Sequence, residues 1–337
     1  MRLHHAVWVL CALALSACAG GPPPVAMPPP HDPNDYPNPY HVDEGWAKLD
    51  RKFGGISAVD MDPDGKSVWV FERCGMPDDG CAKVKTLDPV MQFDSSGKLA
   101  RSWGKGNFLY PHGIFIGRDH HVWLVEGISI SNVVADVIRE YSADGKLLRT
   151  MGESGTRGDT PDRFNGVSDV LVAPDGSIFV ADGHSDKTNN RILKYDPTGK
   201  YLLSWGRLGK GPGEFNSPHG LAMDSHGRLY VADRSNSRIQ IFDQQGKFLA
   251  EWKQFGRPSG VYIDKNDNIY VADSLSNETA NPGFKNGIRW GKVSDGKVVG
   301  FIPWGEYNAI EAVVTDDAGN IYAGFTNTLN FRKFARN

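Results

Sequence analysis

The chain has 337 residues, a formal net charge of −3 and 23% charged residues, so its charge gives no indication of a nucleic-acid partner. The 11% of aromatic residues and the 39 glycines are typical of an all-β protein with many turns. The length alone favours two domains, but the repeats described below account for nearly all of it as a single domain.

The first residues are expected to be an export signal. After a positively charged start, Ala6–Leu15 is apolar but too short to cross a bilayer. Leu15–Cys18 (Leu-Ser-Ala-Cys) resembles the lipobox of bacterial lipoproteins, so we expect a signal peptide over 1–17 and lipidation of Cys18; the alternative is an ordinary signal with a chance cysteine. Ala19, directly after the cysteine, resembles the residue found in lipoproteins that are sorted to the outer membrane, so we expect that membrane rather than the inner one. The expected location is the periplasmic side of the bacterial cell envelope, with membrane contact through the lipid only.

A proline-rich segment follows the expected lipid site. Between Gly20 and Tyr40, proline stands at nearly every second position, which is incompatible with helix or sheet. We therefore predict that residues 18–43 form an extended, semi-rigid tether.

From residue 44 onward the sequence repeats. The clearest copy is Glu214–Phe255, in which turn residues separate four short apolar runs: Leu221–Met223, Leu229–Ala232, Ile239–Phe242 and Phe248–Trp252. Such runs, rich in β-branched and aromatic residues, predict four antiparallel strands. The length and turn spacing match one blade of a β-propeller.

Six copies of this unit begin in the chain. Their first turns are Asp64-Gly65, Arg118-Asp119, Asp175-Gly176, His226-Gly227, Asn266-Asp267 and Ala318-Gly319, each followed by an apolar strand. The sixth copy lacks its last strand. Trp46–Leu49 resembles the outer-strand segments of other copies, so we predict that it completes the last blade and closes the ring. The predicted fold is an all-β, six-bladed β-propeller over residues 44–337.

Two cysteines remain after the signal and the lipid site. Cys74 and Cys81 lie in one long loop. In an exported protein such a pair predicts a disulfide. A metal pair is the alternative, but the spacing is wide for a Cys-x₂₋₄-Cys site.

The innermost strand of each blade lines the central channel of a propeller. Aligning the copies gives one residue per blade at the channel mouth: Ser57, His112, Ser168, His219, Ser259 and Ile310. The next position inward includes the carboxylates Asp169 and Glu311. A second set, after the second strand of the blades, includes Arg73 and Arg234, with His184 one residue further along its own blade. A ring would bring these residues together from distant parts of the sequence.

This arrangement predicts a metal site. His112 and His219 would hold a divalent ion with Glu311 or Asp169, since imidazole and carboxylate are common ligands. His184 would act as a general base and the two arginines would bind a carboxylate. Simpler interpretations remain open: the Pro-His-Gly histidines bond only to backbone, His184 is solvated, and the arginines pair with their sequence neighbours, Arg73 with Glu72 and Arg234 with Asp233.

The repeats F-x-x-P-H-G-L-A-x-D and G-x-L-Y-V-A-D-R-x-N-x-R-I-Q-I-F-D are identified as NHL repeats. Residues 44–337 resemble the peptidyl-α-hydroxyglycine α-amidating lyases and their bacterial relatives. The resemblance implies a six-bladed propeller that cleaves a peptidyl-α-hydroxyglycine into peptide amide and glyoxylate. It also implies a zinc held by three channel histidines, a catalytic tyrosine, arginines that bind the substrate carboxylate, and a structural calcium.

The family's functional residues match this chain in part. His112 and His219 stand where two zinc ligands are expected, and Arg73 and Arg234 match the two arginines. His184 holds the place of the tyrosine. The family's third histidine falls in a P-H-D triplet that here reads Ala309-Ile310-Glu311, with Glu311 in the place of a carboxylate that serves calcium.

The predicted function is therefore a metal-dependent lyase or hydrolase similar to peptidylamidoglycolate lyase, with Zn²⁺ or another divalent ion, a structural Ca²⁺, and a small anionic or peptide substrate. The alternative is a non-catalytic, lipid-anchored NHL protein that binds a protein partner, because a fold does not dictate function. A hydrolase like the six-bladed sugar lactonases fits less well, since those sites are richer in carboxylate and Asn ligands.

Overall fold

The computed structural model describes residues 32–75, 80–127, 129–130, 133–305, 309–328 and 330–337. The predicted signal peptide, the lipidation site Cys18 and most of the predicted tether lie outside these residues. The chain divides into two compact units, Met1–Asp32 and Pro33–Asn337, and the fold described here is that of the second. Within the described residues, no helix has the length and apolar character needed to cross a membrane.

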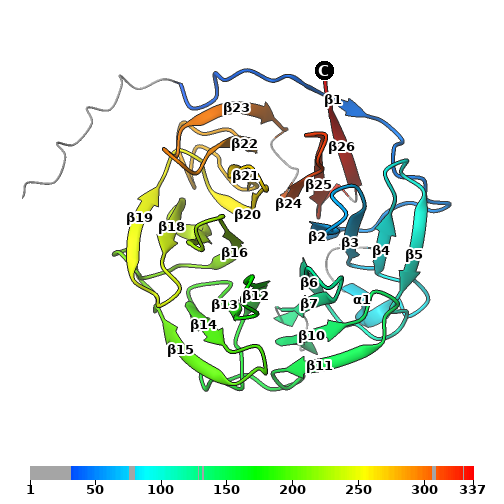
Figure 1. Cartoon of the computed structure of the whole chain (residues 1–337), viewed down its shortest axis with the longest axis vertical. Coiled ribbons are helices and arrows are strands. Elements are labelled where there is room, and N and C mark those ends of the chain that lie inside the picture. The colour runs from blue at the N-terminus through cyan, green and yellow to red at the C-terminus, as the bar shows by residue number, and fades with distance from the viewer. Residues whose placement is uncertain (1–31, 76–79, 128, 131–132, 306–308, 329) are drawn as a thin grey trace, which may run out of the picture. The chain divides into compact units, whose positions relative to one another are not determined.

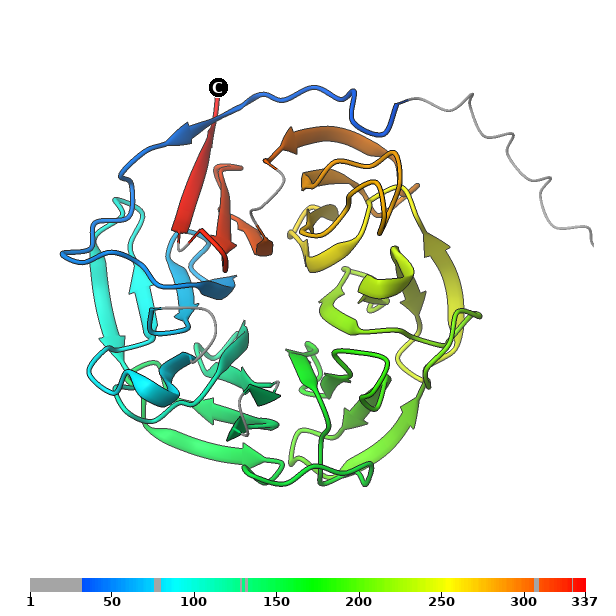
Figure 2. The same ribbon diagram turned by 180° about the vertical axis from the view of Figure 1, so that it is seen from behind.

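The second unit consists of six four-stranded antiparallel sheets arranged in a ring around a central channel (Figures 1 and 2). The first blade contains β2 (Ile56–Met61), β3 (Val68–Glu72), β4 (Val90–Phe93) and β5 (Leu99–Trp103). The second contains β6 (Pro111–Ile116), β7 (Val122–Glu126), β10 (Val137–Tyr141) and β11 (Leu147–Met151). The third contains β12 (Val167–Val172), β13 (Ile178–Asp182), β14 (Arg191–Tyr195) and β15 (Tyr201–Trp205).

The other three blades follow the same order. The fourth contains β16 (Pro218–Met223), β17 (Leu229–Asp233), β18 (Arg238–Phe242) and β19 (Phe248–Trp252). The fifth contains β20 (Pro258–Ile263), β21 (Asn268–Asp273), β22 (Gly287–Lys292) and β23 (Val298–Pro303). The sixth contains β24 (Ile310–Thr315), β25 (Ile321–Phe325), β26 (Asn330–Arg336) and β1 (Tyr40–Asp43). Short elements outside the blades are β8 (Ser129–Ile130), β9 (Val133–Val134), α1 (Gly80–Lys83) and the 3₁₀ turn η1 (Arg234–Asn236).

An N-terminal strand closes the ring, as predicted, but it is not the predicted segment. β1 pairs antiparallel with β26, with Tyr40 opposite Arg336. Trp46 lies outside the sheet and packs against the rings of Tyr322 and Phe331, at centroid distances of 4.9 and 5.9 Å. Ala47 and Leu49 pack against the same apolar cluster, and Lys48 forms only an isolated bridge with Lys98 of the first blade. The apolar character of Trp46–Leu49 therefore reflects packing and not pairing with β26.

The start of the propeller is also earlier than predicted. β1 lies within residues 18–43, the range expected to be a tether, and the chain before it follows the outside of the fifth and sixth blades. The Asn34 side chain accepts a hydrogen bond from the Lys285 backbone N–H at 2.7 Å, and the Pro37 carbonyl accepts one from the Phe301 N–H at 3.2 Å. Proline suits this role because an edge segment needs few backbone donors.

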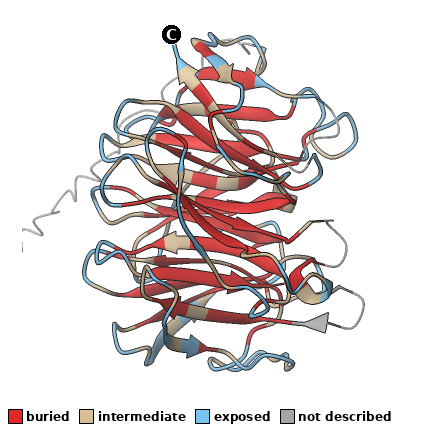
Figure 3. Cartoon of the chain, turned by 90° about the vertical axis from the view of Figure 1, so that its right-hand side faces the viewer, coloured by how far each residue is buried: buried red, intermediate tan, exposed pale blue. Residues whose placement is uncertain are grey.

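The strands are mostly buried and the loops at the two faces of the propeller are mostly exposed (Figure 3). The second strands β3, β7, β13, β17 and β25 are buried at every residue, whereas the outer strands β5 and β15 have only exposed and half-buried residues. The inner strands are sandwiched between neighbouring blades, so their sequences are apolar runs and their few polar residues stand out as candidates for function.

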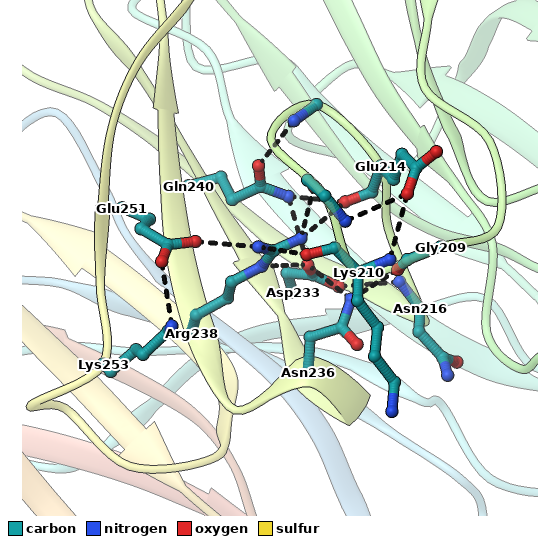
Figure 4. A network of polar contacts seen from close by, with 12 residues as sticks. Gly209, Lys210, Glu214, Asn216, Asp233, Asn236, Arg238, Gln240, Glu251 and Lys253 are labelled. Carbon is teal, nitrogen blue, oxygen red and sulfur yellow. Dashed lines mark hydrogen bonds and ion pairs between the residues drawn. The ribbon is translucent and has the colours of Figure 1, made fainter.

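A carboxylate at the end of the second strand fixes the loops around one mouth. In the fourth blade, Asp233 accepts hydrogen bonds from the Asn216 backbone N–H at 2.7 Å and from Arg238 Nε at 2.8 Å, and Arg238 also reaches Glu251 (Figure 4). Equivalent carboxylate–arginine pairs occur in four other blades: Glu72–Arg51, Glu126–Arg139, Asp182–Arg191 and Asp273–Arg289. These pairs neutralise buried charge and hold the loop that leads into each innermost strand.

Candidate metal centre

A β-bulge at the start of the innermost strand turns one residue per blade toward the channel. The register shifts between the first and third residues of the strand in five blades, and between Pro218 and Leu221 in β16. A bulge leaves a residue unpaired and re-aims its side chain. The unpaired residues include His112, His219 and Glu311.

This register corrects one position of the sequence alignment. Ile310 pairs with Phe325 just as Pro111 pairs with Glu126, so Glu311, and not Ile310, is the equivalent of His112. Ile310 is fully buried in the apolar core of its blade. The sixth blade therefore contributes a carboxylate at the level of the two histidines.

Three imidazole rings face one another at this level. The ring centroids of His112 and His219 are 4.9 Å apart, and His184 lies 5.0 Å from each of them. His184 comes from the loop after β13, one residue beyond the Gly183 that follows the strand-end carboxylate. Each of these histidines and Glu311 offers a ligand atom, and the four atoms all lie within 4.8 Å of one another. The structure thus places His184, predicted as a general base, among the candidate metal ligands.

The Pro-His-Gly motif has a local physical explanation. His112 Nδ1 lies 2.7 Å from the Ser168 carbonyl oxygen of the next blade, and His219 Nδ1 lies 3.1 Å from the Ser259 carbonyl oxygen. A side chain at Gly113 would put its Cβ 2.8 Å from that same Ser168 oxygen. Glycine is needed after each histidine because the neighbouring strand approaches so closely.

These contacts leave the other ring nitrogens free to bind an ion. An Nδ1–H that donates to a carbonyl fixes the tautomer whose Nε2 carries a lone pair. The Nε2 atoms of His112 and His219 are buried and have no hydrogen-bond partner among the described residues, although Glu311 Oε1 lies 3.2 Å from His219 Nε2. Two acceptors this close, with no proton donor between them, fit a shared cation.

The protonation states suit the same interpretation. Burial, together with nearby positive groups such as Arg73 and Arg234, lowers the pKa of all three histidines below the usual value. Burial alone would raise the pKa of Glu311, but His219 and Arg234 outweigh it and hold that pKa well below its usual range. At neutral pH the group therefore consists of neutral imidazoles and an ionised carboxylate, the forms that bind metal.

Arg73 and Arg234 flank this group and do not form ion pairs with the carboxylates next to them in sequence. Glu72 binds Arg51, and Asp233 binds Arg238, at 2.8 Å in both pairs. Arg234 instead lies 3.7 Å from Glu311 and 3.3 Å from His184 Nε2. The simpler interpretation, in which both arginines pair only with their sequence neighbours, is wrong.

Asp169 is not brought into the histidine group. Its carboxylate accepts hydrogen bonds from the backbone N–H of Val170 and of Leu221, so that it links the third and fourth blades. It lines a channel cavity of about 1050 Å³ together with Asp60, His112 and Glu311. Burial there raises the pKa of Asp169 to about 8 and that of Asp60 to about 7.

Two residues near the site were not identified from the sequence. Tyr110 precedes the first Pro-His-Gly, and the Arg73 guanidinium lies 4.5 Å from its ring centroid, which orients that arginine. Arg257 precedes Pro258 at the start of β20, and its charge contributes to lowering the pKa of Arg234. The position of Tyr110 directly before the motif was a usable signal, whereas no repeated pattern marks Arg257.

The loop between the first blade's second and third strands carries the predicted disulfide. Cys74 and Cys81 are bonded, with their Cα atoms 4.9 Å apart, and both are buried. The bridge lies next to Arg73, so it constrains the loop that begins at the site.

Comparison with known proteins agrees with the fold and with a lyase-like group. The NHL repeat model matches residues 215–242 and 255–278. Human NHL repeat-containing protein 3 is 32% identical over 202 residues, 58% of this chain and 54% of its own length. Peptidyl-alpha-hydroxyglycine alpha-amidating lyase 1 of Drosophila melanogaster is 29% identical over 183 residues, 50% of this chain and 32% of its own length. This chain thus spans about half or less of each of these relatives.

Among solved structures, a streptogramin B lyase superposes with a TM-score of 0.57 at 15% identity, covering 88% of this chain and 98% of the other. That likeness concerns the fold. The resemblance expected from the sequence is confirmed. The protein carries NHL repeats, is a six-bladed β-propeller, and is similar at low identity to proteins that include amidating lyases.

Proposed function

We propose that this propeller is a metal-dependent lyase, similar to peptidylamidoglycolate lyase, that acts at the channel mouth on a substrate with a carboxylate. The observation that supports the proposal is the pair of buried, unpartnered Nε2 atoms of His112 and His219, with His184 and Glu311 beside them. An arrangement built only for stability would satisfy these polar atoms.

The donor set fits a zinc-type ion. Three imidazoles and one carboxylate suit Zn²⁺ and related transition metals better than Ca²⁺, which takes oxygen ligands. His112, His184, His219 and Glu311 would hold the ion. When bound, such an ion would supply a Lewis acid that polarises a substrate oxygen.

The arginines would orient the substrate. Arg73, held by its hydrogen bond to the Pro111 carbonyl and by the Tyr110 ring, presents its remaining N–H groups to a carboxylate. Arg234 comes from the opposite side of the ring, in the fourth blade, and its buried Nε has no partner. Two guanidinium groups can thus fix a carboxylate next to the imidazole group.

The proton transfer depends on which role His184 takes. As a ligand through Nε2, His184 could not accept a proton at that atom. If it stays free of the ion, its neutral Nε2, 3.3 Å from Arg234 Nη2, can accept a proton from a substrate hydroxyl. The two roles predict different metal affinities for the His184→Ala variant.

Release of glyoxylate from a peptidyl-α-hydroxyglycine tests the proposed reaction. We expect release by the zinc-loaded protein, a loss of at least about 100-fold in the His112→Ala variant, and a raised KM in the Arg73→Gln variant. A loaded protein that releases no glyoxylate above background would refute lyase activity on this substrate. If it also bound no metal, the alternative of a non-catalytic NHL scaffold with a protein partner would be favoured.

Two further expectations remain proposals. Export and lipidation at Cys18 would place the propeller on the periplasmic side of the cell envelope, and a structural calcium would be a second ion. Mass spectrometry of the membrane fraction tests the first, and elemental analysis for calcium tests the second.

A further inference from the structure

We propose, on the basis of the proposed function, that the site selects a substrate with two carboxylate-type groups, and that Arg257 binds the second one. For a peptidyl substrate, this means an acidic residue directly before the reacting C-terminal unit. The argument rests on the position of Arg257, on its unpartnered donor and on the balance of charge at the mouth.

Arg257 reaches the mouth from the loop before β20. Its Nη2 lies 3.4 Å from Ser235 Oγ, and Ser235 directly follows Arg234. Within the part of the chain that the structure describes, its buried Nε has no hydrogen-bond partner, and the same is true of Arg234 Nε. Two neighbouring arginines thus each retain a buried donor that no described protein atom satisfies, and a bound anion would satisfy them both.

The carboxylates near Arg257 are already engaged. Asp273, whose charge acts on Arg257, is bound by the fully buried Arg289 at 2.8 Å and by Ser276 at 2.7 Å. Arg257 therefore has no dedicated ion-pair partner among the contacts described for it. A guanidinium that is more than half buried is costly without a counter-ion, so an anionic ligand is the expected complement.

The charge of the whole mouth leads to the same conclusion. Arg73, Arg234 and Arg257 carry three formal positive charges and Glu311, 3.7 Å from Arg234, carries one formal negative charge, which leaves a surplus of two positive charges before any ion binds. A monocarboxylate would neutralise only part of this surplus. A dicarboxylate would neutralise all of it, and a divalent cation would increase the preference further.

The direct test compares two ligands of similar size, glutarate with two carboxylates and butyrate with one. Calorimetry on the purified protein, with and without a chelator, should show that glutarate binds at least about tenfold more tightly. Arg257→Gln should lose about tenfold in glutarate affinity, and Arg257→Lys should recover part of it. Arg207→Gln, at a guanidinium whose side chain is 81% exposed, is the control and should bind as the unmodified protein does.

Thermal melting of each variant separates a binding effect from misfolding. If Arg257→Gln melts like the unmodified protein and still binds glutarate as tightly, Arg257 does not hold the second carboxylate and the inference is wrong. Equal affinity of the unmodified protein for glutarate and butyrate overturns it as well, as does a failure to bind either of them.

Turnover distinguishes this inference from the proposed function. Two hydroxyglycine peptides that differ only in Glu or Gln before the last unit should differ at least about tenfold in kcat/KM, and the difference should shrink in Arg257→Gln. Glyoxylate release without that preference would refute the dicarboxylate inference and keep the lyase. Tight glutarate binding that depends on Arg257, with no glyoxylate from either peptide, would refute the lyase and keep the anion site.

Discussion

Replacing His184 by alanine distinguishes a metal ligand from a general base. The three rings form a nearly equilateral triangle with sides of 4.9, 5.0 and 5.0 Å, so the distances between the rings do not set His184 apart from His112 or His219. Changing a residue that only supports a ligand typically costs 10–100-fold in metal affinity. We therefore expect His184→Ala to lose at least about 100-fold, or about 2.8 kcal/mol, as His112→Ala does.

Competition with a chromophoric zinc chelator at neutral pH measures this affinity. His226→Ala is the control, because His226 is 71% exposed at an outer hairpin turn and should have no effect. The reasoning is refuted if His184→Ala binds zinc as tightly as the unmodified protein while His112→Ala does not. In that case His184 would be free to act as the base, as the sequence analysis predicted.

Three further outcomes follow from the fold. A variant that begins at residue 45, and so lacks β1, should melt at a lower temperature and self-associate because the edge of β26 is exposed. A control variant that begins at Pro33 should do neither. Equal melting temperatures of the two variants would show that β1 is dispensable. Asp233→Ala should cost about 3–5 kcal/mol in chemical denaturation, because it removes the fully buried partner of Arg238 and leaves only the partly exposed Glu251; a loss below about 1 kcal/mol would contradict this. In metal-free protein the free energy of unfolding should fall from pH 6.5 to 8, since folding raises the pKa of Asp60 to about 7 and of Asp169 to about 8, so the folded state binds more protons than the unfolded one. The three site histidines oppose this slope while the unfolded chain, with a histidine pKa near 6.5, still binds protons, so their contribution fades above about pH 7 and the fall is clearest from pH 7 to 8. A flat profile there that matches the Asp60→Asn, Asp169→Asn double variant would refute this assignment.

The repeats made the blades predictable because each blade is a local unit. Strand runs and turns within Glu214–Phe255 depend on neighbours in sequence, and β16 to β19 match the four predicted runs closely. The histidine pair was predictable for the same reason, since an identical Pro-His-Gly recurs in two copies at the same place. The disulfide was predicted from the even cysteine pair together with the expected export signal.

Contacts across the ring were not predictable in the same way. The closing strand depends on which segment reaches β26, and both β1 and Trp46–Leu49 have apolar character. A bulge shifts the register by one residue without a marker in the sequence, so Glu311 was aligned one position too far along. His184 joins the histidine group only because the third blade's loop turns over the channel, and Arg257 only because the fourth and fifth blades meet.

The metal content of the purified protein tests the central claim most directly. The account predicts about one tightly held zinc-type ion per chain by elemental analysis, retained through gel filtration and lost in a His112→Ala, His219→Ala double variant. Protein that carries no such ion, takes up none when zinc is added, and melts at the same temperature with and without zinc would contradict it.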